Sequence, residues 1–111
     1  MTESDQVILV ITSVDSESTA EQLAEKLLRM RLAACIQIDS KVVSKYWWQG
    51  TLRKEKECRL TIKSTERHWI AINNNLERYH PYDVPEIIKI PVTVCSGAYK
   101  DWVMSETNQQ M

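Results

Sequence analysis

Two histidines and three cysteines are the side chains of this sequence best suited to ligate a metal ion or to act as a nucleophile. The cysteines, Cys35, Cys58 and Cys95, form no Cys-x-x-Cys pair and have no spacing typical of a zinc site. His68 falls in the first turn of a predicted helix, where an exposed polar side chain is ordinary, so we interpret it as solvated or structural. A site therefore has to be sought around His80 or Cys35.

His80 lies in a corner between a predicted helix and a predicted strand, and Pro81 stiffens that corner. Tyr82, Asp83 and Glu86 follow within a few residues. Two interpretations stay open: a histidine that caps the helix or braces the loop, and a histidine that contacts a metal ion or a small molecule. On the second interpretation, His80 is the metal ligand of this chain.

Cys35 is the cysteine with a candidate site role, because strand pairing is expected to place it opposite Lys63, and a neighbouring lysine favours the thiolate form. A nucleophile also needs a positioned base, and His80 would supply one only if the end of its helix folded back to Cys35. Cys58 and Cys95 are expected to be small buried apolar residues. The sequence has no Gly-rich phosphate loop and no Gly-x-Ser-x-Gly motif, so we predict that the protein is not an enzyme.

The stretch of residues 33–64 positions these side chains, and its alternation of apolar and polar residues predicts one long β-hairpin. The outgoing half places the following apolar residues on one face: Ala34, Ile36, Ile38, Val42, Tyr46 and Trp48. The returning half presents Leu52, Cys58, Leu60 and Ile62. A two-residue turn at 49–50 would set apolar against polar faces, so we predict a three-residue turn at 48–50. That turn pairs Ile36 with Ile62 and Ile38 with Leu60, unless a bulge near Asp39 and Ser40 resets the register.

The hairpin is too long for the domain that carries it. Strands of about 15 residues at about 3.3 Å per residue give an arm of roughly 50 Å. A compact domain of this size has a radius of gyration near ~13 Å, so the arm must extend beyond its own core. Tyr46, Trp47 and Trp48 stand at its tip, where large apolar side chains call for a partner. We predict an obligate homo-oligomer, with Tyr46 and Trp48 at its subunit contacts.

The remaining segments predict two longer helices and two further strands. Residues 7–13 are continuously apolar and suit a central strand, and Ser18 with Glu21 forms a capping box for the helix that follows. Ser64 or Thr65 is expected to cap a second helix whose inner stripe contains Trp69, Ile72, Leu76 and Tyr79. Residues 86–92 form a last strand, which Pro91 places at an edge or a bulge. A short helix capped by Ser96 then holds Tyr99, Trp102 and Val103.

This order predicts an α+β fold of the ferredoxin-like βαββαβ type, with an antiparallel sheet, a long hairpin arm and a short C-terminal helix. Residues 1–111 form a single domain, and residues 1–6 and 106–111 are expected to be frayed. Both helices cover one face of the sheet, so the other face and the arm both require partners.

Composition limits the partners and the compartment. The formal net charge of −1 implies no general attraction to nucleic acid or to an anionic membrane, and we expect neither as a partner. Trp47 and Trp48 have no basic surround that would favour base stacking over packing between subunits. We interpret the mixed charges of residues 53–57 as a solvated strand end. The polar, acidic start is unlike a signal peptide, and unpaired thiols suit a reducing compartment, so we expect a cytoplasmic protein.

Four segments in this order resemble the CutA family of divalent-cation tolerance proteins: RLAAC at 31–35, YWWQG at 46–50, IKS at 62–64 and HPYDVPEII at 80–88. The positions of Tyr99 and Trp102 also fit, and the resemblance extends over roughly residues 7–102. It implies a cytoplasmic homotrimer of ferredoxin-like protomers whose hairpins wrap across neighbours. It also implies a non-enzymatic role in tolerance of copper or another divalent metal, weakly bound, with His80 as the contributing ligand.

Copper ligation in that family is associated with a cysteine at the end of the first strand and two histidines before the Pro-Tyr pair. Ile11 and Tyr79 occupy two of these positions here, and His80 occupies the third. The architecture is also similar to that of PII-type signalling trimers, which implies an alternative function as a signalling or scaffold trimer. In that case an inter-subunit cleft binds a small molecule or a partner protein and is lined by Cys35, Trp47, Lys63, Tyr82 and Glu86.

Overall fold

The computed structural model describes residues 6–108, and the fraying expected for residues 1–5 and 109–111 lies outside the described residues. The chain forms strand β1 (Val7–Val14), helix α1 (Glu17–Arg29), strands β2 (Cys35–Trp48) and β3 (Thr51–Thr65) and a 3-10 turn, η2 (Glu66–His68). Helix α2 (Trp69–Tyr79), strand β4 (Ile88–Pro91) and helix α3 (Gly97–Asn108) follow. The predicted order of elements is confirmed.

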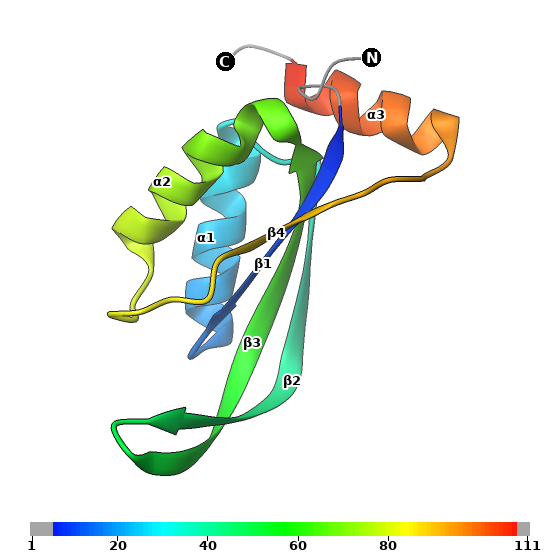
Figure 1. Cartoon of the computed structure of the whole chain (residues 1–111). Coiled ribbons are helices and arrows are strands. Elements are labelled where there is room, and N and C mark those ends of the chain that lie inside the picture. The colour runs from blue at the N-terminus through cyan, green and yellow to red at the C-terminus, as the bar shows by residue number, and fades with distance from the viewer. Residues whose placement is uncertain (1–5, 109–111) are drawn as a thin grey trace.

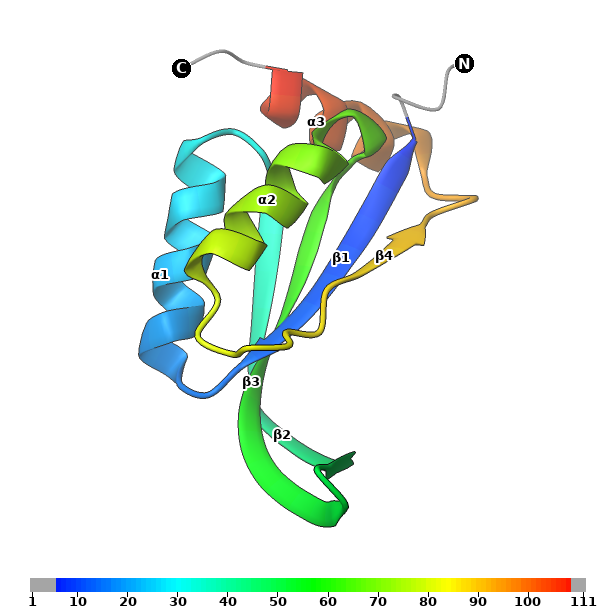
Figure 2. The same ribbon diagram turned by 60° about the vertical axis from the view of Figure 1, so that its left-hand side comes forward.

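The four strands form one antiparallel sheet in the order β2-β3-β1-β4. Helices α1 and α2 lie side by side on one face of this sheet, and α3 crosses its upper end (Figures 1 and 2). The core lies between the sheet and these two helices, where Ile8, Val10, Leu60 and Ile62 are fully buried. The ferredoxin-like α+β arrangement is therefore confirmed, with β1 at its centre and β4 at an edge. Among the described residues, no helix is both long and apolar enough to cross a bilayer.

The ends of α1 and α2 differ from the predicted ones. Ser16, rather than Ser18, caps α1, because its hydroxyl accepts a hydrogen bond from the backbone N–H of Thr19 at 3.2 Å. Thr65 precedes the 3-10 turn, but its hydroxyl makes no capping bond. Tyr79, which the helical spacing places on the core side, is instead 41% exposed, with its ring 4.2 Å from the ammonium of Lys26. A cation–π contact at the surface thus takes the place of core packing.

The hairpin begins in the predicted register and then departs from it. Ile36 pairs with Ile62 and Ile38 with Leu60, as the alternation predicts. Ser40 and Lys41 then lie opposite the single residue Cys58, which is a two-against-one β-bulge. The shift leaves a two-residue turn, with positive φ at both Gln49 (51°) and Gly50 (78°), so the predicted three-residue turn is wrong.

The bulge also divides the face that we predicted to be continuous. One extra residue reverses the alternation of β2, so Val42, Tyr46 and Trp48 point away from the face that carries Ile36 and Ile38. Beyond the bulge the arm bends and curls to the side of the sheet opposite the helices (Figure 2). The arm accounts for the elongated shape of the molecule, whose longest extent is 46 Å.

Three predictions near the C-terminus need correction. Cys95 is exposed rather than buried, because it lies in the extended segment between β4 and α3, which no helix covers. The helix α3 continues to Asn108, and the Arg31 guanidinium contacts the Glu106 carboxylate at 3.4 Å, so residues 106–108 are not frayed. At the other end, the carbonyl of Gln6 accepts a hydrogen bond from Glu66. Strand β4 is shorter than predicted, but the edge position of Pro91 is confirmed.

The backbone conformation of the hairpin turn can be tested by substitution at Gly50. A Cβ added at Gly50 or at Gly97 would meet no atom within 4 Å, and only Gly50 has a positive φ. We therefore expect Gly50→Ala to lower the free energy of unfolding by about 1 kcal/mol, because an L-residue is strained in the left-handed region. Gly97→Ala is the matched control and should not destabilise. Equal effects in urea denaturation would contradict the left-handed conformation of Gly50.

Candidate functional site

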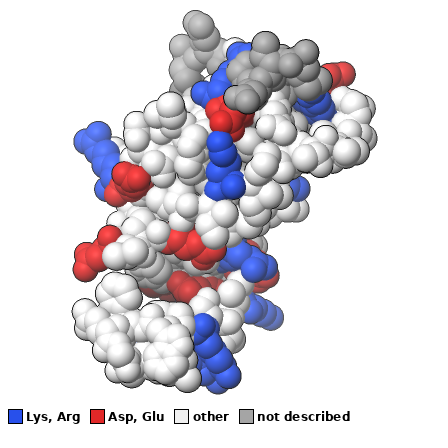
Figure 3. Space-filling view, viewed as in Figure 1, with Lys and Arg blue, Asp and Glu red and all other residues white. Residues whose placement is uncertain are grey.

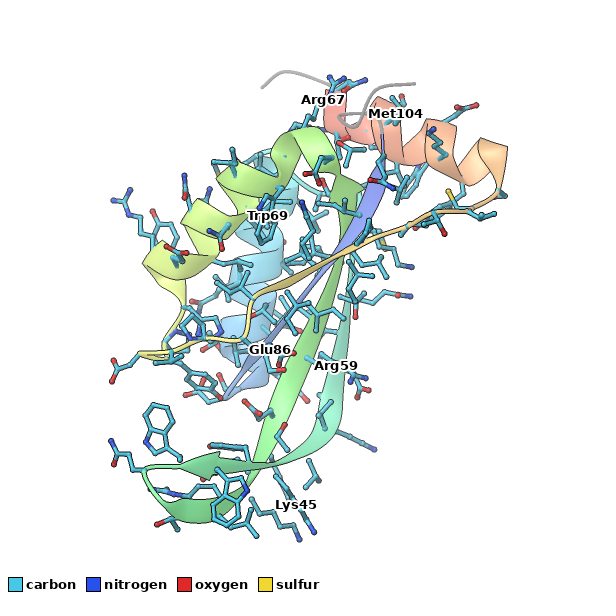
Figure 4. All side chains as sticks on the ribbon, in the orientation of Figure 1. Lys45, Arg59, Arg67, Trp69, Glu86 and Met104 are labelled. Carbon is cyan, nitrogen blue, oxygen red and sulfur yellow. The ribbon has the colours of Figure 1, made fainter. Side chains whose placement is uncertain are left out.

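A cavity of about 630 Å³ opens between the bent arm, the end of β1 and the loop of residues 82–86. Figure 3 shows acidic side chains gathered where the body of the molecule meets the arm, and Figure 4 places Glu86 on the loop above the arm. The register places Ser44, Tyr46 and Trp48 on the inner side of the arm because of the bulge. The complete lining is Ser13, Asp15, Ser44, Tyr46, Trp48, Arg53, Glu55, Lys56, Glu57, Tyr82, Asp83, Val84 and Glu86.

Carboxylates dominate the charge of this cavity. Five of them line it, and two cationic side chains, Arg53 and Lys56, also border it. The hydroxyl of Ser13 donates a long hydrogen bond of 3.4 Å to Glu86. A concave surface with an excess of one sign of charge concentrates ions of the opposite sign, so the cavity favours cations over anions.

Tyr82 ties the loop to the arm across this cavity. Its hydroxyl donates a hydrogen bond of 2.7 Å to the Glu57 carboxylate. Burial raises the pKa of the Tyr82 phenol well above its usual value, and the hydrogen bond to Glu57 and the negative charges of Glu57 and Asp15 raise it further. The phenol therefore stays protonated and remains a donor to Glu57 throughout the physiological range.

His80 holds the other end of the same loop against β1. Its Nδ1 accepts a hydrogen bond from the backbone N–H of Tyr82 at 3.1 Å, so the ring proton lies on Nε2. That N–H donates to the Ser13 carbonyl at 2.9 Å and lies 3.0 Å from the Thr12 hydroxyl. Burial lowers the pKa of His80, although the Ser13 carbonyl and the charges of Asp15 and Glu57 act in the opposite direction. The neutral ring thus uses both nitrogens to brace the loop.

These contacts limit what His80 can do for a metal ion. A metal would have to displace the Tyr82 amide from Nδ1 or the proton from Nε2. No group of three or more His, Cys, Asp or Glu side chains among residues 6–108 is arranged to hold an ion. Soft or borderline metals need several nitrogen or sulfur donors, so the donor set here does not fit a tight copper site.

The register also separates His80 from Cys35. Cys35 pairs with Lys63, which pairs with Leu9, whereas His80 contacts Thr12 and Ser13 farther along β1. Three residues along a strand span about 10 Å. The helix end does not fold back to the root of the hairpin, and the Cys35–His80 pair that a nucleophilic mechanism would require is not formed.

Within one chain, the five residues predicted to line an inter-subunit cleft lie in three places. Tyr82 and Glu86 line the cavity. Cys35 and Lys63 pair nearer the other end of the sheet, where the Lys63 ammonium lies 5.8 Å from the Tyr99 ring. Trp47 is 73% exposed and, one residue from Tyr46 and Trp48, points to the outer side of the arm.

The residues that sequence reasoning missed are carboxylates from distant segments. Asp15 follows β1, and Glu55 and Glu57 belong to the returning strand of the arm. The interpretation of residues 53–57 as a solvated strand end assigned these two carboxylates no site. The alternative of a bulge near Asp39 and Ser40 was open from the sequence, and it would have reversed the faces of the outer part of the arm.

His68 has the structural role that its position predicts. Its Nε2 donates a hydrogen bond of 2.7 Å to the carbonyl of Thr107 and so fixes α3 to the start of α2. Burial lowers the pKa of this histidine, while the bond to Thr107 partly opposes the effect. Both histidines of the chain are therefore neutral braces in the folded protein.

The fold and the cavity define a ferredoxin-like α+β protein whose bent hairpin arm borders an acidic cavity. Residues 8–106 match the family described as CutA1 divalent ion tolerance protein, and the chain belongs to that family. The divalent-cation tolerance protein CutA of Pectobacterium atrosepticum is 36% identical over 99 residues, which cover 89% of each chain. The corresponding protein of Salmonella newport is 35% identical and covers 88% of this chain and 85% of its own.

Solved structures of the same family have the same fold. CutA1 from Oryza sativa superimposes with a TM-score of 0.91 at 29% identity, covering 98% of this chain and 100% of that chain. The divalent cation tolerance protein from Thermus thermophilus superimposes with a TM-score of 0.88 at 33% identity, covering 92% of this chain and 99% of that chain. The resemblance of the four sequence segments to this family is confirmed.

The two histidine braces predict how stability depends on pH. Because the folded pKa values lie below the unfolded value of about 6.5, the unfolded chain binds more protons as the pH falls through this region. The free energy of unfolding should therefore decrease on acidification from about pH 7.5 until both folded histidines are protonated. His80→Gln removes one of these groups and should flatten the pH dependence in denaturant titrations, as should His68→Gln. An unchanged slope in either variant would exclude that histidine as a cause.

Proposed function

We propose that this protein is a non-enzymatic homotrimer that acts in divalent-cation tolerance by binding divalent cations weakly in the acidic cavity. The observation that carries the cation proposal is the excess of carboxylates around one open hollow beside His80 and Tyr82. Its donors are mostly oxygens, which suit hard divalent ions that keep part of their water shell. Family membership supports the link to divalent-cation tolerance.

The uncovered face of the sheet supports the oligomer. Leu9, Ile11, Ile88 and Ile90 point to the same face of the sheet, on the side opposite α1 and α2. Ile88 is 47% exposed and Ile90 is 40% exposed. Together with the inner side of the arm, where Tyr46 and Trp48 lie, this strip is an apolar surface that a second copy of the chain would cover.

Copper binding through His80 is the narrower form of the proposal. The ring would have to give up a hydrogen bond to Tyr82 or to Ser13, so any copper affinity at this position is weak and coupled to loosening of the loop.

A cytoplasmic location is part of the same proposal. Its support is that Cys35, Cys58 and Cys95 are all free thiols, as expected in a reducing compartment, and that burial raises the pKa of the Cys58 thiol and so disfavours the reactive form.

The size and lining of the cavity support a second candidate function. A volume of about 630 Å³ is within the usual range for small-molecule sites, and the rings of Tyr46, Trp48 and Tyr82 border it. On this proposal the protein is a signalling or scaffold trimer, similar to the PII type, that binds an organic ligand.

The carboxylates of the cavity disfavour a phosphate-bearing ligand and favour an amine. Spermidine should therefore raise the melting temperature of the protein, and ATP should not.

The trimer proposal predicts a selective effect of charge on the uncovered face. The double change Ile88→Lys and Ile90→Lys should convert trimers to monomers, because burying two ammonium groups without partners is prohibitive. Ile70→Lys on α2 is the control, since Ile70 is 72% exposed on the helical side. Deleting residues 45–53 should also give monomers or aggregates. Multi-angle light scattering that finds stable trimers for both variants would reject this interface.

The cation proposal predicts a different pattern of loss. Native mass spectrometry with Cu(II), Zn(II) and Mg(II) should detect weak binding that falls about tenfold in the double variant Asp15→Asn and Glu86→Gln, because two nearby charges are removed. Glu25→Gln on α1 is the matched control, since the Glu25 side chain is exposed at 62% far from the cavity lining. His80→Ala should weaken copper binding more than the binding of Zn(II) or Mg(II). Binding that survives the cavity variant would contradict the proposed site.

A further inference from the structure

The outer side of the arm is distinct from the cavity and carries a separate set of side chains. Trp47 pairs with Leu52 nearest the tip, Lys45 pairs with Lys54 behind them, and Val43 follows. We call these five residues the tip patch. Trp47, Leu52 and Val43 are 73%, 62% and 52% exposed, although all three are apolar. Figure 3 shows uncharged atoms at the end of the arm bordered by Lys and Arg, and Figure 4 marks Lys45 there.

The lysine pair of the tip patch is unfavourable within the protein. Residues directly opposite on paired strands lie close enough to repel when they carry like charges. Within residues 6–108 the ion pairs join other side chains and give neither Lys45 nor Lys54 a carboxylate partner. An anionic partner outside the chain would relieve this repulsion.

The order of the tip patch along the arm indicates what kind of anionic partner fits. Successive pairs on one side of a hairpin are about 7 Å apart, so the apolar pair precedes the cationic pair by that distance. An anionic bilayer has the same order in depth: apolar side chains enter the boundary between headgroups and acyl chains by about 5–10 Å, and lysines remain among the lipid phosphates and carboxylates. Trp47 suits this boundary because indole favours the interface.

We infer that the tip patch docks on anionic lipid surfaces. Single-stranded nucleic acid fits it less well, because one exposed indole cannot stack successive bases and Leu52 and Val43 offer nothing to a phosphate backbone. The near-zero net charge of the whole chain does not oppose such docking, because the acidic residues of the arm's returning strand, Glu55 and Glu57, line the cavity on the other side of the arm. The inference is independent of the cation and ligand proposals, and it requires only that the tip patch stay free in the oligomer.

Sedimentation with vesicles tests the inference. The full-length protein should partition onto phosphatidylcholine vesicles that contain phosphatidylserine and not onto pure phosphatidylcholine. The double variant Lys45→Gln and Lys54→Gln should bind about thirtyfold more weakly, because each lysine near the surface contributes about fivefold. Arg29→Gln with Arg78→Gln removes the same charge from the helices and should bind as the parent does. Equal binding of parent and lysine variant, or binding that ignores phosphatidylserine, would overturn the proposal.

Fluorescence quenching locates the inserted residue. Brominated lipid in the phosphatidylserine vesicles should quench part of the parent's tryptophan emission, and Trp47→Phe should lose that quenched part while it still binds. If the lysine variant instead loses its oligomeric state in light scattering, the patch is a subunit contact and the lipid proposal fails. Binding to a single-stranded oligonucleotide in place of vesicles would also overturn it.

Discussion

The two-against-one bulge at Ser40 and Lys41 is the constraint on which the rest of this molecule depends. Without it, the alternation of β2 would continue and Tyr46 and Trp48 would share a face with Ile36 and Ile38. The single extra residue turns those rings to the side of the sheet opposite the helices, and the bend brings the arm beneath the end of β1. The cavity, its acidic lining and the separate outer side of the arm all follow from this one irregularity.

The bend is held by polar contacts that depend on protonation state. Tyr82 joins the loop to the arm through Glu57, and His80 joins the same loop to β1 through Ser13. The first contact needs a protonated phenol, and the second needs a neutral imidazole. Burial moves both the phenol and the imidazole toward the required form, so the environment that encloses these groups also stabilises the contacts they make.

The sequence predicts the elements well because each rests on a local or regular pattern. Alternation identifies the root of the hairpin and its register, and helical spacing identifies the buried face of α1. The faces of the arm's tip were mispredicted because the apolar and polar residues of β2 alternate without a visible break. A bulge moves all later residues of a strand to the opposite face and leaves no trace in that alternation. The same error hid the site, since Tyr46 and Trp48 face the cavity only because the bulge reverses the alternation of β2. The exposure of Tyr79 and Cys95 could not be predicted from the sequence either, because the exposure of a side chain depends on which elements pack over it in the fold.

The position of His80 illustrates how a histidine in a family motif can have a structural role. The motif from His80 to Ile88 resembles the family pattern, and in this structure it builds a rigid corner through the ring and the backbone of Tyr82. Bracing a loop and ligating a metal can both require a histidine at this position. The two roles use the Nδ1 lone pair of the ring differently. Here the Nδ1 lone pair belongs to the Tyr82 amide. The contacts of His80 are therefore explained by the fold alone, and the proposed affinity for cations rests on the carboxylates that line the cavity.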